Sequence, residues 1–319
     1  MTGQRSVSRR TALKSIGSAV AVGGLLGTSG TVAAAEGWRA VESETDRDLH
    51  GVRYTSDGAY AVGGGGDVLQ RTDDGWKRVI DGGPTGNGNP LYGADVTDGG
   101  DRLWFVGGSG AIGEYDVTTG TLYDHSAPND VTNNFNDVAV QGPAGDANVY
   151  IAGDSGAIYY SFENGETGSW DNTTPGSGSA INALDFHGPR SGHAVDGNQT
   201  VFATDDGGSY EKIGIANANY NFYGVDSDAA DDLTVSGGGG SVYDWDGAEW
   251  VRTGLGDADL NDVAVDGGDG LTVGGGGKVF AQTGGTWAQE DTPTGANLNG
   301  VVRGTVDIAV GASGAVIEK

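Results

Sequence analysis

The chain has 319 residues, no cysteine and a formal net charge of −27 at pH 7, with 17 basic and 44 acidic residues. Without cysteine it can have neither a disulfide framework nor a lipid-modified cysteine. The excess of negative charge argues against partners such as nucleic acid or an anionic membrane surface, because both require a positively charged footprint.

The first 35 residues have the features of an export signal. The paired arginines Arg9 and Arg10 precede a weakly apolar stretch at 16–32, which is rich in glycine and alanine and leads into three alanines. A positive start, an apolar core and a small-residue cleavage site are typical of secretory signals, and the paired arginines resemble the twin-arginine type. The apolar stretch falls short of the ~20 strongly apolar residues that a membrane span needs. We therefore expect a twin-arginine-type signal peptide at 1–35 and a mature extracellular or cell-surface protein, without stable membrane insertion, that begins near Glu36.

Seven copies of one short motif follow along the chain. Each copy has a bulky apolar residue, then a polar or aromatic one, a small or acidic one and an apolar one. Successive copies are 38 to 46 residues apart, and no helical periodicity occurs between them. A period near 40 in an all-β sequence predicts a β-propeller. The first residues of the seven copies are Leu49, Leu91, Phe135, Ile181, Phe222, Leu260 and Leu298.

The sixth copy shows how one unit divides into four strands. Its first strand, at 263–265, is apolar on both faces, as expected for a strand packed between neighbouring blades. Strands at 271–273 and 278–282 flank a run of four glycines, which can form a tight hairpin because glycine adopts positive φ without steric cost. Trp287 begins a fourth, outer strand. The other copies have comparable turns at the same place, so we expect four-stranded blades throughout.

The two ends of the repeat region complement each other. The seventh copy stops one strand short, at the end of the chain, whereas residues 37–41 match the outer strand of the first copy at 75–79. We therefore predict that the N-terminal strand completes the last blade and removes an exposed sheet edge. The expected architecture is a seven-bladed β-propeller of four-stranded blades, in one domain over residues 36–319.

Three turn segments carry a family resemblance. Residues 72–76, 204–210 and 283–287 look like degenerate Asp-boxes, the hairpins of sialidase-type (BNR) propellers. The repeat as a whole, over 36–319, resembles the photosystem II stability and assembly-factor family. This second resemblance implies protein partners. The first implies a site with three arginines that grip a carboxylate, a Tyr/Glu nucleophile pair and an acid/base Asp.

The charge of the mature chain is more extreme than that of the whole. The predicted signal holds four of the basic residues and no acidic one, which leaves 13 basic against 44 acidic residues and a net charge of −31. Aspartate greatly exceeds glutamate and lysine is scarce, a composition that resembles proteins of extremely halophilic archaea. Dense carboxylates keep such proteins soluble in molar salt.

Residues with catalytic or metal-binding potential do not form a recognisable site. Of the nine arginines after the predicted signal, only Arg53 and Arg303 fall within expected first strands, so three convergent arginines are not visible. A glycosidase pair of carboxylates stays open, because 44 acids offer many combinations. The four histidines lack zinc-ligand spacing, and we expect His187 and His193 to lie in a turn. No cofactor is expected, while calcium is plausible but cannot be placed.

One set of residues is a candidate binding site. The second residue of each motif opens the innermost strand, so the seven should form a ring around one mouth of the channel, with Asp137 and Asp262 beside it. Amides, phenols and an imidazole in a central depression suit carbohydrate or peptide recognition. The alternative is structural, with each polar residue bonding to the neighbouring blade. The seven residues are His50, Tyr92, Asn136, Asn182, Tyr223, Asn261 and Asn299.

The three members of the ring that depart from asparagine are the stronger binding candidates. Loops at 81–90, 125–134 and 171–180 should overhang the same mouth, as binding loops often do. Asn172 and Asn198 begin N-glycosylation sequons. Together these features favour an exported, non-catalytic propeller that binds or assembles an envelope protein or an extracellular glycan. A secreted sialidase-like glycoside hydrolase is the alternative.

Overall fold

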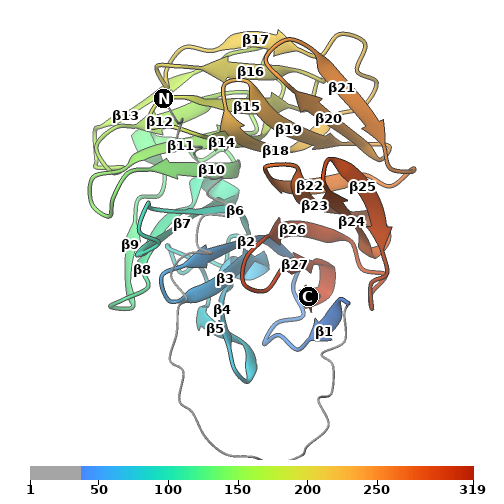
Figure 1. Cartoon of the computed structure of the whole chain (residues 1–319). Helices are drawn as coiled ribbons and strands as arrows, with labels where there is room; N and C mark the ends of the chain where they lie inside the picture. Colours follow the sequence, from blue (N-terminus) through green and yellow to red (C-terminus); the bar gives the residue numbers. More distant parts are fainter. Residues whose placement is uncertain (1–36) are drawn as a thin grey trace, which may run out of the picture.

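The computed structural model describes residues 37–319 as seven antiparallel sheets of four strands each. In Figure 1 the sheets are arranged as blades around a centre, with their first strands innermost and their fourth strands at the rim. The prediction of a seven-bladed propeller is therefore confirmed. The predicted signal peptide lies outside the described residues. Within those residues, no helix is long and apolar enough to span a membrane.

Each blade, numbered 1 to 7 in chain order, contributes one strand to each of four concentric layers. The inner strands are β2 (Leu49–Thr55), β6 (Leu91–Val96), β10 (Phe135–Gln141), β14 (Ile181–Phe186), β18 (Phe222–Ala229), β22 (Leu260–Asp266) and β26 (Leu298–Val302). The second strands are β3 (Gly58–Gly63), β7 (Arg102–Gly107), β11 (Asn148–Gly153), β15 (Gly192–Asp196), β19 (Asp232–Gly237), β23 (Asp269–Gly274) and β27 (Ile308–Gly311). The third strands are β4 (Val68–Thr72), β8 (Ile112–Asp116), β12 (Ile158–Ser161), β16 (Val201–Thr204), β20 (Ser241–Trp245), β24 (Lys278–Thr283) and β28 (Val316–Glu318). The outer strands are β5 (Gly75–Ile80), β9 (Thr121–Asp124), β13 (Trp170–Thr173), β17 (Glu211–Gly214), β21 (Trp250–Gly254), β25 (Thr286–Glu290) and β1 (Arg39–Val41).

Tight turns join the second and third strands, as predicted from the glycine runs. In blade 1 this turn has Gly65 at φ +68° and Gly66 at φ +76°, the left-handed region that glycine adopts without strain. Several of these turns are single 3₁₀ turns, and a further 3₁₀ turn lies in the loop between blades 2 and 3. The described 3₁₀ turns are η2 (Gly64–Gly66), η3 (Gly108–Gly110), η4 (Pro128–Asp130), η5 (Gly275–Gly277) and η6 (Ala312–Gly314). We call the face where these hairpins lie and the inner strands begin the upper face.

The ring is closed by the N-terminal strand, as predicted. β1 pairs antiparallel with β28, so blade 7 combines the two ends of the described chain. The buried carboxylate of Glu318 secures this seam: it accepts hydrogen bonds from Arg39 at 2.6 Å, from Arg71 at 2.9 Å and from the indole of Trp76 at 3.1 Å. The carboxylate thus bonds to β1, β4 and β5, which makes the seam both a strand pairing and a charge cluster.

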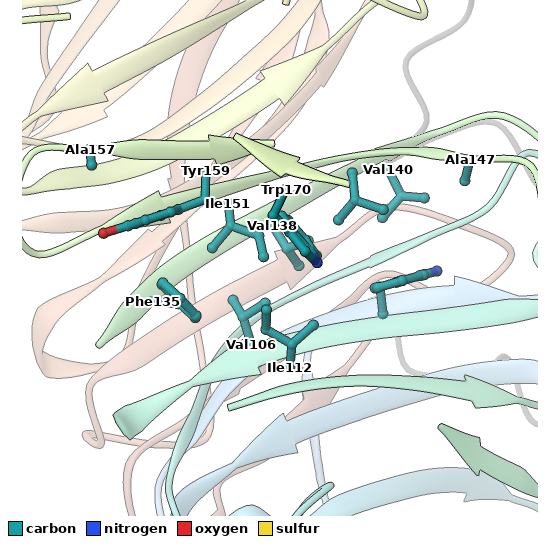
Figure 2. Close-up of a cluster of buried hydrophobic side chains, with 12 residues drawn as sticks. Val106, Ile112, Phe135, Val138, Val140, Ala147, Ile151, Ala157, Tyr159 and Trp170 are labelled. Atoms are coloured by element: carbon teal, nitrogen blue, oxygen red, sulfur yellow. The ribbon is translucent and has the colours of Figure 1, made fainter. Parts of the chain in front are cut away.

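The hydrophobic core lies between blades rather than in one central mass. Between blades 2 and 3, Val106 and Ile112 pack with Phe135 and Trp170 (Figure 2). Because each inner strand is covered on both faces by neighbouring blades, most of its side chains on both faces are apolar, which is the pattern predicted from the sixth copy.

Candidate functional site

A β-bulge at the start of every inner strand builds the mouth of the channel. In all seven inner strands the register with the second strand shifts between the first and third residues of the motif. The second residue is therefore extra, and a bulge of this kind turns its side chain away from the regular alternation. Where the third residue is glycine, it lets neighbouring strands approach: a Cβ on Gly93 would lie 2.5 Å from the Cα of Asp137.

The structure brings all seven predicted ring residues together at the upper mouth. They line one small cavity of about 80 Å³, together with Arg53, Asp137 and Asp262. All seven side chains are partly buried. A cavity of this size has room for a few water molecules or the tip of one side chain, given about 30 Å³ for each liquid water. Their role in binding stays a prediction.

The four asparagines of the ring hold neighbouring blades together. The side-chain amide of each donates a hydrogen bond to the main-chain carbonyl of the first motif residue in the next blade. Donor and acceptor are Asn136 and Ile181 at 2.9 Å, Asn182 and Phe222 at 2.6 Å, Asn261 and Leu298 at 2.8 Å, and Asn299 and Leu49 at 2.9 Å. For these four residues the hydrogen bonds support a structural role, in which each polar side chain bonds to the neighbouring blade.

Carboxylates on the inner strands make a second set of links between blades. Asp137 accepts the main-chain N–H of Leu184 at 3.2 Å, and Asp262 accepts that of Val301 at 2.9 Å. Three further bridging carboxylates were not expected from the sequence, although an acidic residue inside an otherwise apolar strand was the available signal. These are Asp95 with Val140, Asp185 with Ser227, and Asp226 with Val265.

The three departures from asparagine make no such link within residues 37–319. The rings of His50 and Tyr92 meet edge to face, with centroids 5.3 Å apart. Burial lowers the pKa of His50 below its usual value, so the imidazole is neutral at neutral pH, and burial raises the pKa of the Tyr223 phenol. These three side chains therefore present polar and aromatic groups that make no hydrogen bond to a neighbouring blade within the described residues.

The arginines do not form a carboxylate-gripping triad at this mouth. Arg53 is the one arginine among the residues that line the cavity; it is buried, and its Nε lies 3.8 Å from a carboxylate oxygen of Asp95. Arg303 follows the last residue of β26, at the opposite end of the channel, and donates to the carbonyl of Asp269 at 2.6 Å. The expectation that Arg303 belongs to an inner strand is therefore wrong by one residue.

Two histidines meet on the lower face. His187 adjoins the hairpin after β14, whereas His193 lies within β15, so only part of the predicted turn placement is right. Both Nδ1 atoms contact the Ser227 hydroxyl of blade 5, at 2.9 and 2.7 Å. Burial lowers the pKa of His193 to about 3. Among the described residues, no group of three or more His, Asp or Glu could hold a metal ion.

The predicted upper-face loops lead into the inner strands as expected, although β13 extends to Thr173 and shortens the third of them. Both predicted glycosylation asparagines, Asn172 and Asn198, are exposed. Whether they are modified stays a prediction.

A larger cavity on the upper face was not foreseen from the sequence. It measures about 510 Å³ and lies between the loop that enters β18 and the last two strands of blade 5. A run of aromatic, asparagine and arginine residues within 40 positions was the available signal, but only the fold brings them together. The lining residues are Ile215, Ala216, Asn217, Asn219, Tyr220, Tyr243, Trp250 and Arg252.

Comparison with known proteins shows the fold. No protein-family model matches the chain, and no curated protein matches its sequence. Among solved structures it is similar to YCF48 from Cyanidioschyzon merolae, with a TM-score of 0.68 and 18% identity over 88% of this chain and 98% of that one. It is also similar to YCF48 bound to D1 peptide (TM-score 0.69, 14% identity, 88% and 94% covered) and to the WD40 β-propeller domain of Doa1 (TM-score 0.70, 12% identity, 88% and 94% covered).

Proposed function

We propose that the chain is an exported, non-catalytic propeller that binds a protein of the cell envelope through the mouth of its channel. The observation that carries this proposal is the division of the ring. Four amides are used between blades, whereas the partly buried His50, Tyr92 and Tyr223 are left for a partner. Tyrosine side chains near the centre of a surface are typical of the residues that dominate protein interfaces.

The small size of the mouth supports binding rather than catalysis. A cavity of about 80 Å³ can accept the tip of one inserted side chain, but it cannot enclose a sugar substrate. The residues that line it include a single arginine, Arg53, whereas sialidase-like chemistry would need three. A similar propeller has been solved with a bound peptide, the structure titled YCF48 bound to D1 peptide. The sequence features of residues 1–35 support export.

Affinity capture tests this proposal. The mature chain would be immobilised in molar KCl and exposed to solubilised envelope proteins, and the retained proteins would be identified and quantified by mass spectrometry. We expect one protein at stoichiometric level, lost when Tyr92 and Tyr223 are both changed to Ala. Tyr123→Ala is the matched control, because Tyr123 is 43% exposed and lies on the outer strand β9.

Two results would contradict the proposal. Retention that survives the double substitution would place the interface elsewhere. Shortened glycans released into the supernatant, without a retained protein, would favour the glycoside hydrolase.

A further inference from the structure

The 510 Å³ cavity of blade 5 has a filled counterpart in blade 1, and the two blades differ at matched positions. Arg252 and Arg78 each stand two residues after the outer-strand tryptophan, and they pair with Tyr243 and Leu69 of the third strand. Two residues before each of these partners, directly after the hairpin, blade 5 has Ser241 where blade 1 has Asp67. Each blade therefore has an arginine at the equivalent position. In blade 5 it faces the hydroxyl of Ser241, and in blade 1 it faces the carboxylate of Asp67.

Blade 1 neutralises its arginine. The buried carboxylate of Asp67 lies 3.2 Å from Arg78 and 3.0 Å from Arg47, and it also accepts the Thr45 hydroxyl at 2.7 Å. Arg47 precedes the inner strand by two residues and lies over Gly65 of the hairpin. The space between loop, hairpin and outer strand is thus closed by ion pairs.

Blade 5 leaves its arginine without a charge partner. Arg252 donates from Nε at 3.3 Å and from Nη2 at 2.9 Å to the hydroxyl oxygen of Ser241. Within residues 37–319 no carboxylate lies at ion-pair distance from this guanidinium. Its Nη1 and the second N–H of Nη2 remain, and such a pair of parallel donors matches the two oxygens of a carboxylate. Two other described arginines also lack an ion pair, but Arg190 lies over the Phe162 ring and Arg303 donates to the carbonyl of Asp269. Arg252 instead lines an open cavity, and this placement suits an anionic ligand.

The remaining walls of the cavity are aromatic and neutral. Tyr220 occupies the position of Arg47, lies over Gly239 of the hairpin and is 44% exposed. Trp250 donates its indole N–H to Ile213, which fixes the ring at the cavity wall. Tyr243 is 4% exposed and packs edge to face on Phe222, while its hydroxyl has no hydrogen-bond partner within the described residues.

We propose that this cavity binds a carboxylate-bearing sugar, a hexuronate unit of an extracellular glycan. The carboxylate pairs with the free edge of Arg252, and the apolar face of the sugar ring packs on Tyr220 or Trp250. The Tyr243 hydroxyl and the amides of Asn217 and Asn219 suit the sugar hydroxyls. The volume falls within the ~300–1,000 Å³ of small-molecule pockets, which favours a sugar over a long peptide. This site is separate from the mouth, so it does not depend on the protein-binding proposal.

Calorimetric titration of the mature chain in molar KCl tests the site. The probes are β-1,4-linked triglucuronate and cellotriose, which differ only in their carboxylates. We expect triglucuronate to bind at least about tenfold more tightly, because the bidentate contact is available to it alone. Arg252→Gln should remove this preference. Ser241→Asp should remove it too, because it recreates the Asp67–Arg78 pair inside blade 5.

Arg190→Gln is the matched control for loss of one positive charge, because Arg190 lies on the lower face, over the Phe162 ring. This variant should keep the preference for triglucuronate. Equal affinity for the two sugars, absence of binding, or a preference that survives both Arg252→Gln and Ser241→Asp would overturn the proposal. So would tighter binding of a tripeptide with a free terminal carboxylate, since that result would identify a peptide site.

Discussion

Equivalent positions in blade 1 and blade 5 have different roles. Blade 1 has Arg47, Asp67 and Arg78 there, and the three side chains fill the space with ion pairs. Blade 5 has Tyr220, Ser241 and Arg252, and a cavity of about 510 Å³ remains. The decisive difference is one buried carboxylate. A position that stabilises one copy of a repeat can therefore be open for binding in another.

The mouth of the channel shows the same contrast within a single ring. Asn261 and Asn299 bond to the next blade, whereas His50 and Tyr92 bond to no neighbouring strand in the described part of the chain. In both places, the residues that hold the fold together are charged or amide side chains that bond to a neighbouring element. The residues that replace them form the candidate binding sites. Substitutions at either kind of position can test that division.

Removing the blade 1 carboxylate should destabilise the fold most. Asp67→Ser removes a fully buried carboxylate that faces Arg47 and Arg78 and accepts the Thr45 hydroxyl, and it leaves both arginines only the exposed Asp81. Because these contacts to a charged group are lost together, we expect the free energy of unfolding to fall by about 3 kcal/mol. Denaturant unfolding in molar KCl measures the change. A loss below about 0.5 kcal/mol would mean that the ion pairs do not close this blade.

Acid should weaken blades 4 and 5, where the histidine contact lies, by a smaller amount. Burial, and next the neighbouring His187, lower the pKa of His193 from 6.5 to about 3. Between these values the unfolded chain binds a proton that the folded chain does not, so stability falls as the pH drops through this window. His193 alone contributes a slope of about 1.4 kcal/mol per pH unit, or about 2 kcal/mol at pH 5, and the lowered pKa values of His50 and His187 act in the same direction. His193→Asn, which can still bond to Ser227, should flatten the dependence; an unchanged slope would assign it to other groups.

Removing one amide of the ring should cost less than either. Asn299→Ala deletes the hydrogen bond to Leu49 and leaves that carbonyl without its donor, so we expect a loss of about 1.5 kcal/mol. Thermal unfolding at fixed salt checks this value. If Asn299→Ala instead abolished capture of the protein partner at unchanged stability, the asparagines would belong to the interface.

Restoring the repeat at a departing position should have the smallest effect on stability. His50→Asn places an amide where it can reach the carbonyl of Leu91, as Asn299 reaches that of Leu49. We expect stability to stay the same or rise by about 0.5 kcal/mol, with weaker binding of the protein partner. Lower stability together with unchanged binding would reverse the roles assigned to this position.

Much of the architecture could be predicted from the sequence, because the repeat carries it. The motif period, the glycine hairpins and the match between residues 37–41 and 75–79 indicated seven blades and the closing strand, and the structure has both. The ring of second residues could also be predicted, since one position per copy must converge on the axis. The bulge that turns them inward left no separate sequence signal.

The blade 5 cavity could not be predicted in the same way. The cavity exists because position 241 is a serine and not a carboxylate. That difference has a meaning only once the structure shows that Asp67, at the equivalent position of blade 1, pairs with Arg78. The loop at 215–220 and strand β21 are also about 35 residues apart, so their contact requires the folded blade. The Asp185 and Asp226 links were missed for a related reason, since each acceptor meets its donor in the next copy.

The most direct test is a reciprocal exchange between the two blades. Asp67→Ser and Ser241→Asp would be compared for unfolding free energy and for triglucuronate affinity in the same molar KCl buffer. We predict that Asp67→Ser loses stability but keeps the sugar preference, and that Ser241→Asp keeps stability but loses the preference. Loss of both properties in either variant, or a Ser241→Asp protein that still prefers triglucuronate, would contradict the separation of architectural and binding roles.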